Sequence, residues 1–121
     1  MSQEKITLVI GASENPERYS NIAINMLRDY QYSVIAVGNK IGRVLDVNIL
    51  KEMPKANIHT VTLYVSPKNQ VDFIEPIKSL KPQRVIFNPG TENPEFAKKL
   101  QSLGIEPIEA CTLVMLRTGQ Y

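Results

Sequence analysis

Cysteine and histidine are almost absent from this chain of 121 residues, which holds one of each, Cys111 and His59. A single cysteine excludes a disulfide within the chain, and the two residues together cannot make the four-ligand cluster of a structural zinc site. We therefore expect no metal site, and a reducing, cytoplasmic setting. His59 has no serine or cysteine partner identifiable by spacing, so we expect a surface or edge-strand residue rather than a catalytic base.

Long apolar runs and an excess of charge of one sign are also missing. No window is long enough for a membrane helix, and Met1 to Lys5 lead into a short apolar segment without the features of a signal peptide. The chain has 14 basic and 12 acidic residues and no run of consecutive basic ones, so nucleic-acid binding is unsupported. The length suits one domain over residues 1–121.

Short apolar runs rich in β-branched residues recur at intervals and are typical of strands. The five runs are Ile6 to Ile10, Val34 to Val37, His59 to Val65, Arg84 to Phe87 and, more weakly, Ile105 to Ile108. Segments with helical spacing lie between them, and this alternation of helices with nearly continuous apolar strands predicts a parallel sheet covered on both faces. We predict an α/β, Rossmann-like three-layer sandwich with five parallel strands in the order 3-2-1-4-5.

The helices are predicted from their apolar stripes and end signals. Ile22 to Tyr30 carry such a stripe, and Asn93-Pro94-Glu95 combines a good N-cap, a proline suited to the first helical position and an acid for the positive helix end. Pro76 falls inside another helical pattern, where we expect it to bend or split the helix. A short helix is expected at Val47 to Lys51, and a last helical turn from Thr112.

The most informative segment, Gly11 to Ser20, leaves the first predicted strand and enters the first helix. In a doubly wound sheet such a turn lies at the carboxyl edge, where ligands bind. Gly11 lets the backbone come close to a ligand, while the helix start offers free N–H groups and a positive dipole end to a phosphate. Arg18 can add a charge-assisted contact. This segment therefore predicts a phosphate-binding loop.

A nicotinamide dinucleotide site would carry the glycine fingerprint G-x-G-x-x-G, which this loop lacks. Ser13 and Pro16 stand where the second and third glycines are needed. The second strand ends in Val37-Gly38-Asn39-Lys40, without the acidic residue that usually receives the ribose, and Lys40 suits a phosphate better. An NADP-dependent oxidoreductase using Lys40 on the 2′-phosphate is therefore kept only as an alternative.

Three motifs follow one another along the chain: Gly11-Ala12-Ser13-x-Asn15-Pro16-x-Arg18-x-Ser20, Val37-Gly38-Asn39-Lys40 and Asn88-Pro89-Gly90-Thr91-Glu92-Asn93. In this order and spacing they resemble the stand-alone CoA-binding domain family, over nearly the whole chain. That family is similar to the CoA-binding domain of the succinyl-CoA synthetase α subunit. The resemblance implies that a Rossmann-like domain binds coenzyme A or an acyl-CoA. It carries no active site across, because the phosphorylated histidine of such synthetases belongs to a following domain.

Carried over position by position, the resemblance implies four groups of cofactor-binding residues. The phosphates would be surrounded by Gly11, Ala12, Ser13, Asn15, Pro16, Arg18 and Ser20. The adenosine 3′-phosphate end would be flanked by Val37, Gly38, Asn39 and Lys40. Another wall would be formed by Tyr64, Val65 and Ser66, and the pantetheine arm would be faced by Asn88, Pro89 and Gly90. Lys40 and Ala110 depart from many relatives, which have proline and arginine there.

Simpler interpretations stand beside these. Gly11 and Gly90 could serve only as turn residues, and Arg18 and Lys40 only as surface charges. Cys111 is either a small buried hydrophobe or a thiol close to that of CoA, able to form a mixed disulfide. No paired carboxylates suit acid-base chemistry, so we predict a non-catalytic protein. A protein-interaction module with a vestigial nucleotide site is a second alternative, and a homo-oligomer or a protein partner stays open.

Overall fold

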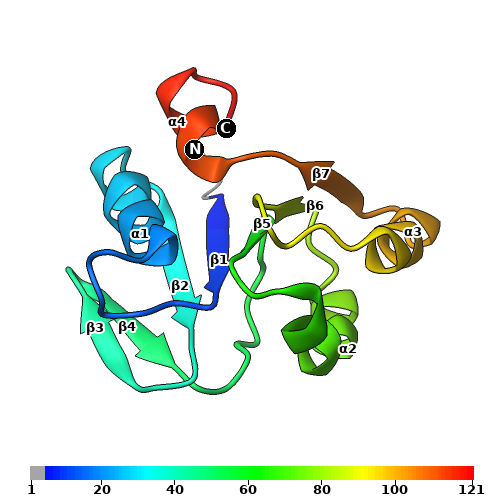
Figure 1. The fold of residues 1–121 in the computed structure, drawn as a ribbon, viewed down its shortest axis with the longest axis horizontal. Helices are drawn as coiled ribbons and strands as arrows, with labels where there is room; N and C mark the ends of the chain where they lie inside the picture. The colour runs from blue at the N-terminus through cyan, green and yellow to red at the C-terminus, as the bar shows by residue number, and fades with distance from the viewer. Residues whose placement is uncertain (1–4) are drawn as a thin grey trace.

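Seven strands form one sheet, in the order β3-β4-β2-β1-β5-β6-β7, within residues 5–121, which a computed structural model describes (Figure 1). The strands are β1 (Ile6–Ile10), β2 (Ser33–Val37), β3 (Gly42–Val44), β4 (Val47–Leu50), β5 (Thr60–Leu63), β6 (Arg84–Phe87) and β7 (Glu106–Glu109). The helices are α1 (Tyr19–Asp29), α2 (Val71–Leu80), α3 (Pro94–Ser102) and α4 (Thr112–Arg117), with a 3-10 turn η1 (Pro67–Gln70) before α2. Residues 1–4, and with them part of the predicted domain and amino terminus, lie outside the described residues.

The predicted α/β class is confirmed, but the predicted sheet is wrong in strand number, direction and order. All neighbouring strands are parallel except β3 and β4, which are antiparallel. The five predicted strands correspond to β1, β2, β5, β6 and β7, and they lie in the order 2-1-3-4-5. The third of them, β5, pairs with β1 instead of lying beyond β2. The reason is that β4 already occupies the outer edge of β2. The third predicted strand therefore pairs with the free edge of β1.

The helix predicted at Val47 to Lys51 is wrong, because this segment forms β4 in a hairpin with β3. Burial in β4 alternates strictly, with Val47 and Ile49 buried and the two residues between and after them exposed. That period of two is the signature of a half-buried strand. The turn has only two residues between the paired Val44 and Val47, and Leu45 adopts a positive φ of 54° there without the glycine that usually marks such turns.

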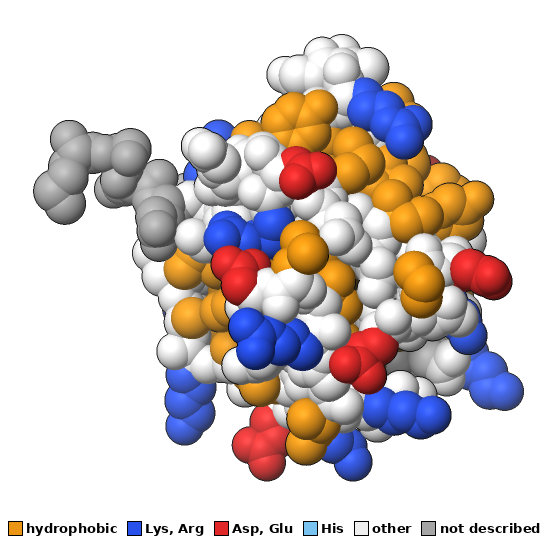
Figure 2. All heavy atoms as spheres, turned by 90° about the vertical axis from the view of Figure 1, so that its left-hand side faces the viewer, with side chains coloured by type: hydrophobic (Ala, Val, Ile, Leu, Met, Phe, Trp, Pro, Cys, Tyr) orange, Lys and Arg blue, Asp and Glu red, His pale blue; other side chains and the backbone are white. Residues whose placement is uncertain are grey.

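Charged side chains of both signs are interspersed over the side of the molecule formed by α1 and this hairpin (Figure 2). Hydrophobic side chains gather at the upper right of the same view. This face therefore carries no patch of a single charge. None of the described helices is both long and apolar enough to span a membrane.

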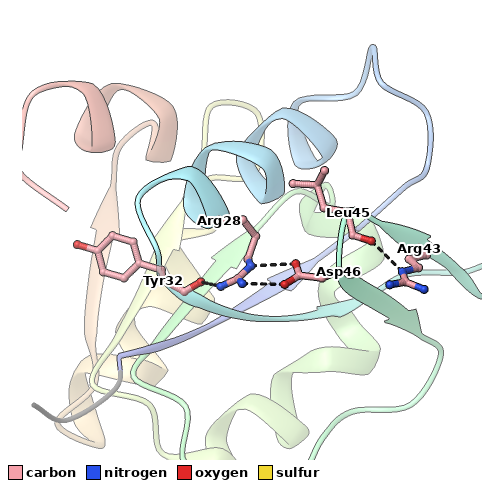
Figure 3. A network of polar contacts seen from close by, with 5 residues as sticks. All are labelled: Arg28, Tyr32, Arg43, Leu45 and Asp46. Atoms are coloured by element: carbon pink, nitrogen blue, oxygen red, sulfur yellow. Dashed lines mark hydrogen bonds and ion pairs between the residues drawn. The ribbon is translucent and has the colours of Figure 1, made fainter.

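An ion pair fastens the hairpin to α1 (Figure 3). Arg28 on α1 donates to both carboxylate oxygens of Asp46 in the hairpin turn, at 2.9 and 2.7 Å, and also to the carbonyl of Tyr32 at 2.7 Å. The hydrogen bonds from Arg28 lower the pKa of Asp46. Arg43 donates to the carbonyl of Leu45 within the hairpin. These contacts fix the hairpin beside the first helix.

The sheet separates two apolar cores, with α1 and α4 on one face and α2 and α3 on the other. The first core includes Val9, Ile24, Leu27, Ile49 and Leu116, and the second includes Leu8, Leu63, Ile77, Phe87, Phe96 and Leu100. The predicted N-cap of α3 is confirmed, since the Asn93 side chain accepts from the Phe96 N–H at 3.2 Å. The predicted helical turn at Thr112 is confirmed as α4. Pro76 lies inside α2 and does not split it.

Candidate functional site

A cavity of about 730 Å³ opens at the carboxyl edge of the sheet, beside the ends of β1, β2, β4 and β5. Its lining residues are Gly11, Ala12, Ser13, Arg18, Gly38, Asn39, Lys51, Tyr64, Val65, Ser66, Asn69 and Phe73. This volume lies in the range of small-molecule sites, and the carboxyl edge is where open α/β sheets bind ligands. Nine of these residues belong to the predicted site.

The loop after β1 is held against two neighbouring strands. The N–H groups of Gly11 and Ala12 both donate to the Val37 carbonyl, at 2.9 and 3.0 Å. Gly11 has a φ of 93°, and a Cβ there would lie 3.0 Å from the carbonyl carbon and oxygen of Tyr64. A glycine is therefore required for both the conformation and the close approach of this loop to the end of β5.

The end of β2 touches the same loop. A Cβ on Gly38 would lie 2.4 Å from the Ala12 carbonyl oxygen, so only glycine fits between the two backbones. The Gly38 N–H donates to the Leu50 carbonyl at 2.9 Å, which places the end of β4 beside it. The first loop and the ends of β2 and β4 thus form one continuous wall of the cavity.

Polar side chains give the first loop its shape before it enters α1. The Ser13 hydroxyl accepts from the Asn15 N–H, and the Asn15 side chain accepts from the Glu17 N–H, each at 3.0 Å. The Asn21 side chain donates to the Ser13 carbonyl at 2.9 Å. Neither Asn15 nor the exposed Pro16 lines the cavity, and Ser20 is buried in α1. These side chains support the loop, and their contact with a ligand stays a prediction.

The electrostatics of the cavity favour an anion. Arg18 lines the cavity and is the N-cap residue of the 11-residue α1, which has no side-chain cap, so the positive dipole end of this helix lies beside the cavity. Arg18 and Lys51 both line the cavity, and neither forms an ion pair with another described residue. A helix start with free cations beside it is the arrangement that binds phosphate.

Tyr64 lines the cavity but directs its hydroxyl into the protein. That hydroxyl is buried without a hydrogen-bond partner among the described residues, and burial raises the pKa of Tyr64 to about 12. The hydroxyls of Thr62 and Thr112 lie near it but bond to each other at 2.8 Å. Tyr64 is therefore an uncharged part of the cavity wall, and its buried hydroxyl has no hydrogen-bond partner of good geometry within the described chain.

The unpaired hydroxyl predicts that Tyr64→Phe leaves the free energy of unfolding unchanged or raises it by up to about 1 kcal/mol, because a buried donor without a partner is removed. Urea denaturation followed by circular dichroism measures this change. The matched control is Tyr121→Phe, whose hydroxyl bonds to the fully buried Thr7 and whose removal should cost about 1 kcal/mol. A loss for Tyr64→Phe as large as that of the control would contradict the assignment.

The loop after β6 holds three predicted residues that do not line the cavity. Asn88 is buried, and its side-chain amide donates to the Thr62 hydroxyl and the Leu63 carbonyl while accepting from the Thr112 N–H, at 2.7 to 2.9 Å. Pro89 and Gly90 are exposed. The Asn88 side chain thus connects β5 and α4, and a role of this loop toward a pantetheine arm stays a prediction.

A buried glutamine connects the remaining walls. Gln70 is fully buried in η1, donates to the carbonyls of Val65 and Thr91 at 3.0 and 2.8 Å, and accepts from the Asn93 side chain at 2.9 Å. One amide therefore joins the cavity wall after β5 to the loop after β6 and to the N-cap of α3. No sequence pattern had marked Gln70.

The other predicted residues lie away from the cavity. Val37 is buried and contributes its carbonyl to the first loop, and Lys40 is exposed and absent from the lining. Cys111 is half-buried at the start of α4, also outside the lining, so its redox role stays a prediction. The ring of His59 contacts the Thr60 hydroxyl at 2.8 Å, and burial lowers the pKa of His59.

Three lining residues were missed by the sequence predictions: Lys51, Asn69 and Phe73. Lys51 follows β4, so it could be found only by recognising the alternation of that strand. Asn69 lies in η1 and Phe73 lies in α2. Their position in the cavity wall depends on how η1 and α2 pack against the sheet, which the local sequence does not specify.

Solved structures share this fold. One, described as an uncharacterized protein, is 45% identical, covers 99% of this chain and 100% of its own, and superposes with a TM-score of 0.94. A hypothetical protein from Pyrococcus horikoshii OT3 is 30% identical, with coverage of 95% and 82% and a TM-score of 0.84. The dinucleotide-forming acetyl-coenzyme A synthetase 1 of Ca. Korarchaeum cryptofilum shares the fold at 13% identity, a TM-score of 0.74 and coverage of 88% and 25%. No curated protein matches the chain.

The family comparison agrees with the sequence motifs. The model described as "CoA binding domain" matches residues 5–117, which include the first loop and all seven strands. The sequence resemblance to CoA-binding domains is thereby confirmed. This chain belongs to the CoA binding domain family.

Proposed function

We propose that this chain binds coenzyme A or an acyl-CoA at the carboxyl edge of the sheet, as a non-catalytic, cytoplasmic protein with a Rossmann-like domain. The observation that carries the proposal is that three features meet in one cavity. They are the close-packed loop after β1, the start of α1, which has no side-chain cap, and the side chains of Arg18 and Lys51, which form no ion pair with another described residue. This arrangement fits the phosphates of the cofactor. The family match supports the identity of the ligand.

The absence of catalysis is proposed from the chemistry of the lining. The lining contains no histidine, cysteine or carboxylate, so it holds no general base titrating near neutral pH and no thiol nucleophile. Within residues 5–121 no three potential metal ligands come together. The cavity therefore suits binding and presentation of a cofactor, with its thiol or acyl group left for a partner protein to use.

Thermal-shift measurements and calorimetry with CoA, acetyl-CoA, dephospho-CoA, NAD and NADPH test this function, since a ligand that binds the native state raises its stability. We expect CoA to bind best. We expect Arg18→Ala to weaken CoA binding about tenfold or more, because a charge-assisted phosphate contact is lost. Arg117→Ala, on the exposed last turn of α4, is the matched control and should leave the affinity unchanged.

Each other outcome points to a different function. Binding of NADPH in preference to CoA would support the reductase that the second-strand lysine suggested. If no cofactor in the panel shifts the melting temperature, the proposal is wrong and a protein-interaction module is favoured.

A further inference from the structure

The charges in the cavity are distributed unevenly. Arg18 ends the loop that follows β1, at the start of α1, and Lys51 directly follows β4. The opposite wall, formed after β5 by Tyr64, Val65 and Phe73 together with neutral polar residues, carries no charge. In the sheet, β2 and β1 lie between β4 and β5. The cavity therefore has one cationic end at Lys51, a cationic centre at Arg18 and an uncharged end after β5.

Coenzyme A has a matching distribution of charge. Its diphosphate lies in the middle of the molecule, a 3′-phosphomonoester lies at the adenosine end, and the pantetheine arm is uncharged. A phosphomonoester loses its second proton near pH 6 and is close to a dianion at neutral pH. Burial of such a group is favourable only beside a cation or several donors. The neutral wall suits the pantetheine arm instead.

The sheet fixes where Lys51 lies. Val37 pairs with Leu50, and the Gly38 N–H donates to the Leu50 carbonyl at 2.9 Å, so Lys51 leaves β4 beside Gly38. In doubly wound sheets the adenosine ribose binds at the end of this second strand, and a cation there receives a ribose phosphate. Lys40, predicted for that role, does not line the cavity, although both lysines are exposed.

From this geometry we propose that Lys51 binds the adenosine 3′-phosphate and so sets the direction of the cofactor, with the adenosine at β2 and β4 and the pantetheine arm along the wall after β5. The inference rests on the proposed function. It makes Lys51 the residue that distinguishes CoA from dephospho-CoA. The hairpin of β3 and β4, through which Lys51 reaches the cavity, becomes a specificity element.

Isothermal calorimetry with CoA and dephospho-CoA on three variants tests the proposal. The wild type should bind CoA about tenfold or more tightly than dephospho-CoA, since one charge-assisted contact is lost with the phosphate. Lys51→Gln should lose most of that preference while its affinity for dephospho-CoA stays unchanged. Lys40→Gln, the neighbouring lysine, and Lys55→Gln, which lies in the loop after β4 and lines a different hollow, should keep the wild-type preference.

Failure of this inference is distinguishable from failure of the proposed function. If the wild type binds CoA but does not discriminate against dephospho-CoA, or if Lys40→Gln abolishes the preference while Lys51→Gln keeps it, the assignment of Lys51 is overturned and CoA binding stands. If Lys51→Gln lowers the affinities for CoA and dephospho-CoA equally, Lys51 contacts a part that both ligands share, and the assignment is also overturned. If the wild type binds neither ligand, both the proposed function and this inference are wrong.

Discussion

Gly38→Ala should destabilise the fold by about 2 to 3 kcal/mol, the cost of forcing an extra carbon into a packed site. The new Cβ would lie 2.4 Å from the Ala12 carbonyl oxygen and 3.1 Å from the Ile49 side chain. Ala12 cannot move away freely, because its own N–H is bonded to the Val37 carbonyl. Either β2 or the first loop must shift, and each shift changes the cavity wall, so CoA binding should fall as well.

The measurement is urea denaturation of the wild type and variant, with CoA affinity measured below the transition. Gly42→Ala is the matched control, because its Cβ would meet only the flexible, exposed side chain of Glu14, at 2.5 to 2.8 Å. That side chain can turn away at the loss of its bond to the Arg43 N–H, so the control should cost less than about 1 kcal/mol. Equal losses in the two variants would show that the contact of Gly38 with Ala12 is not tight.

Asn88→Leu should cost about 3 kcal/mol of unfolding free energy. The Thr112 N–H, at the start of α4, has no partner within its own helix and depends on the Asn88 carbonyl oxygen at 2.9 Å. Removal of the amide leaves this buried donor unpaired and also deprives the Thr62 hydroxyl and the Leu63 carbonyl of a donor. Thermal and urea denaturation measure the loss. The control is Asn48→Leu on the exposed face of β4, whose free energy of unfolding should stay within about 0.5 kcal/mol of the wild-type value.

The same variant tests the predicted contact between this loop and the pantetheine arm. If Asn88 binds the ligand through its side chain, the substitution should weaken CoA binding while stability changes little. If its amide is a structural connection, stability should fall, and the fraction that stays folded should bind CoA with nearly the wild-type affinity. If the variant is as stable as the wild type but binds CoA more weakly, Asn88 is a ligand-binding residue and not the structural connection that its hydrogen bonds indicate.

The central strands and the place of the loop after β1 beside the cavity could be predicted because their signals are local. The central strands β1 and β5 are buried along nearly their whole length and are therefore rich in β-branched and apolar residues, and the Asn93 cap depends only on residues three positions away. The hairpin of β3 and β4 could not be predicted as easily, because strands of three and four residues give little periodicity and the turn at Leu45 lacks a glycine signal.

Differences between the predicted site residues and the cavity lining followed from that missed hairpin. The prediction assigned the phosphate at the adenosine end to Lys40, because Lys40 follows the second strand in sequence, whereas the cavity is lined by Lys51 from the neighbouring strand. The hydrogen bonds of Asn88 join residues 24 to 26 positions apart. Such partners are set by strand order, and the predicted order placed the third strand on the wrong side of the first.

The buried amide of Gln70 has an entropic consequence. It joins the wall after β5 to the N-cap of α3, and the next residue in that chain of contacts, Phe96, packs edge-to-face on Phe87 with ring centroids 5.7 Å apart. This wall is therefore anchored in the second core before any ligand arrives. A site whose wall is already ordered loses little conformational freedom on binding, so more of the contact energy is expressed as affinity.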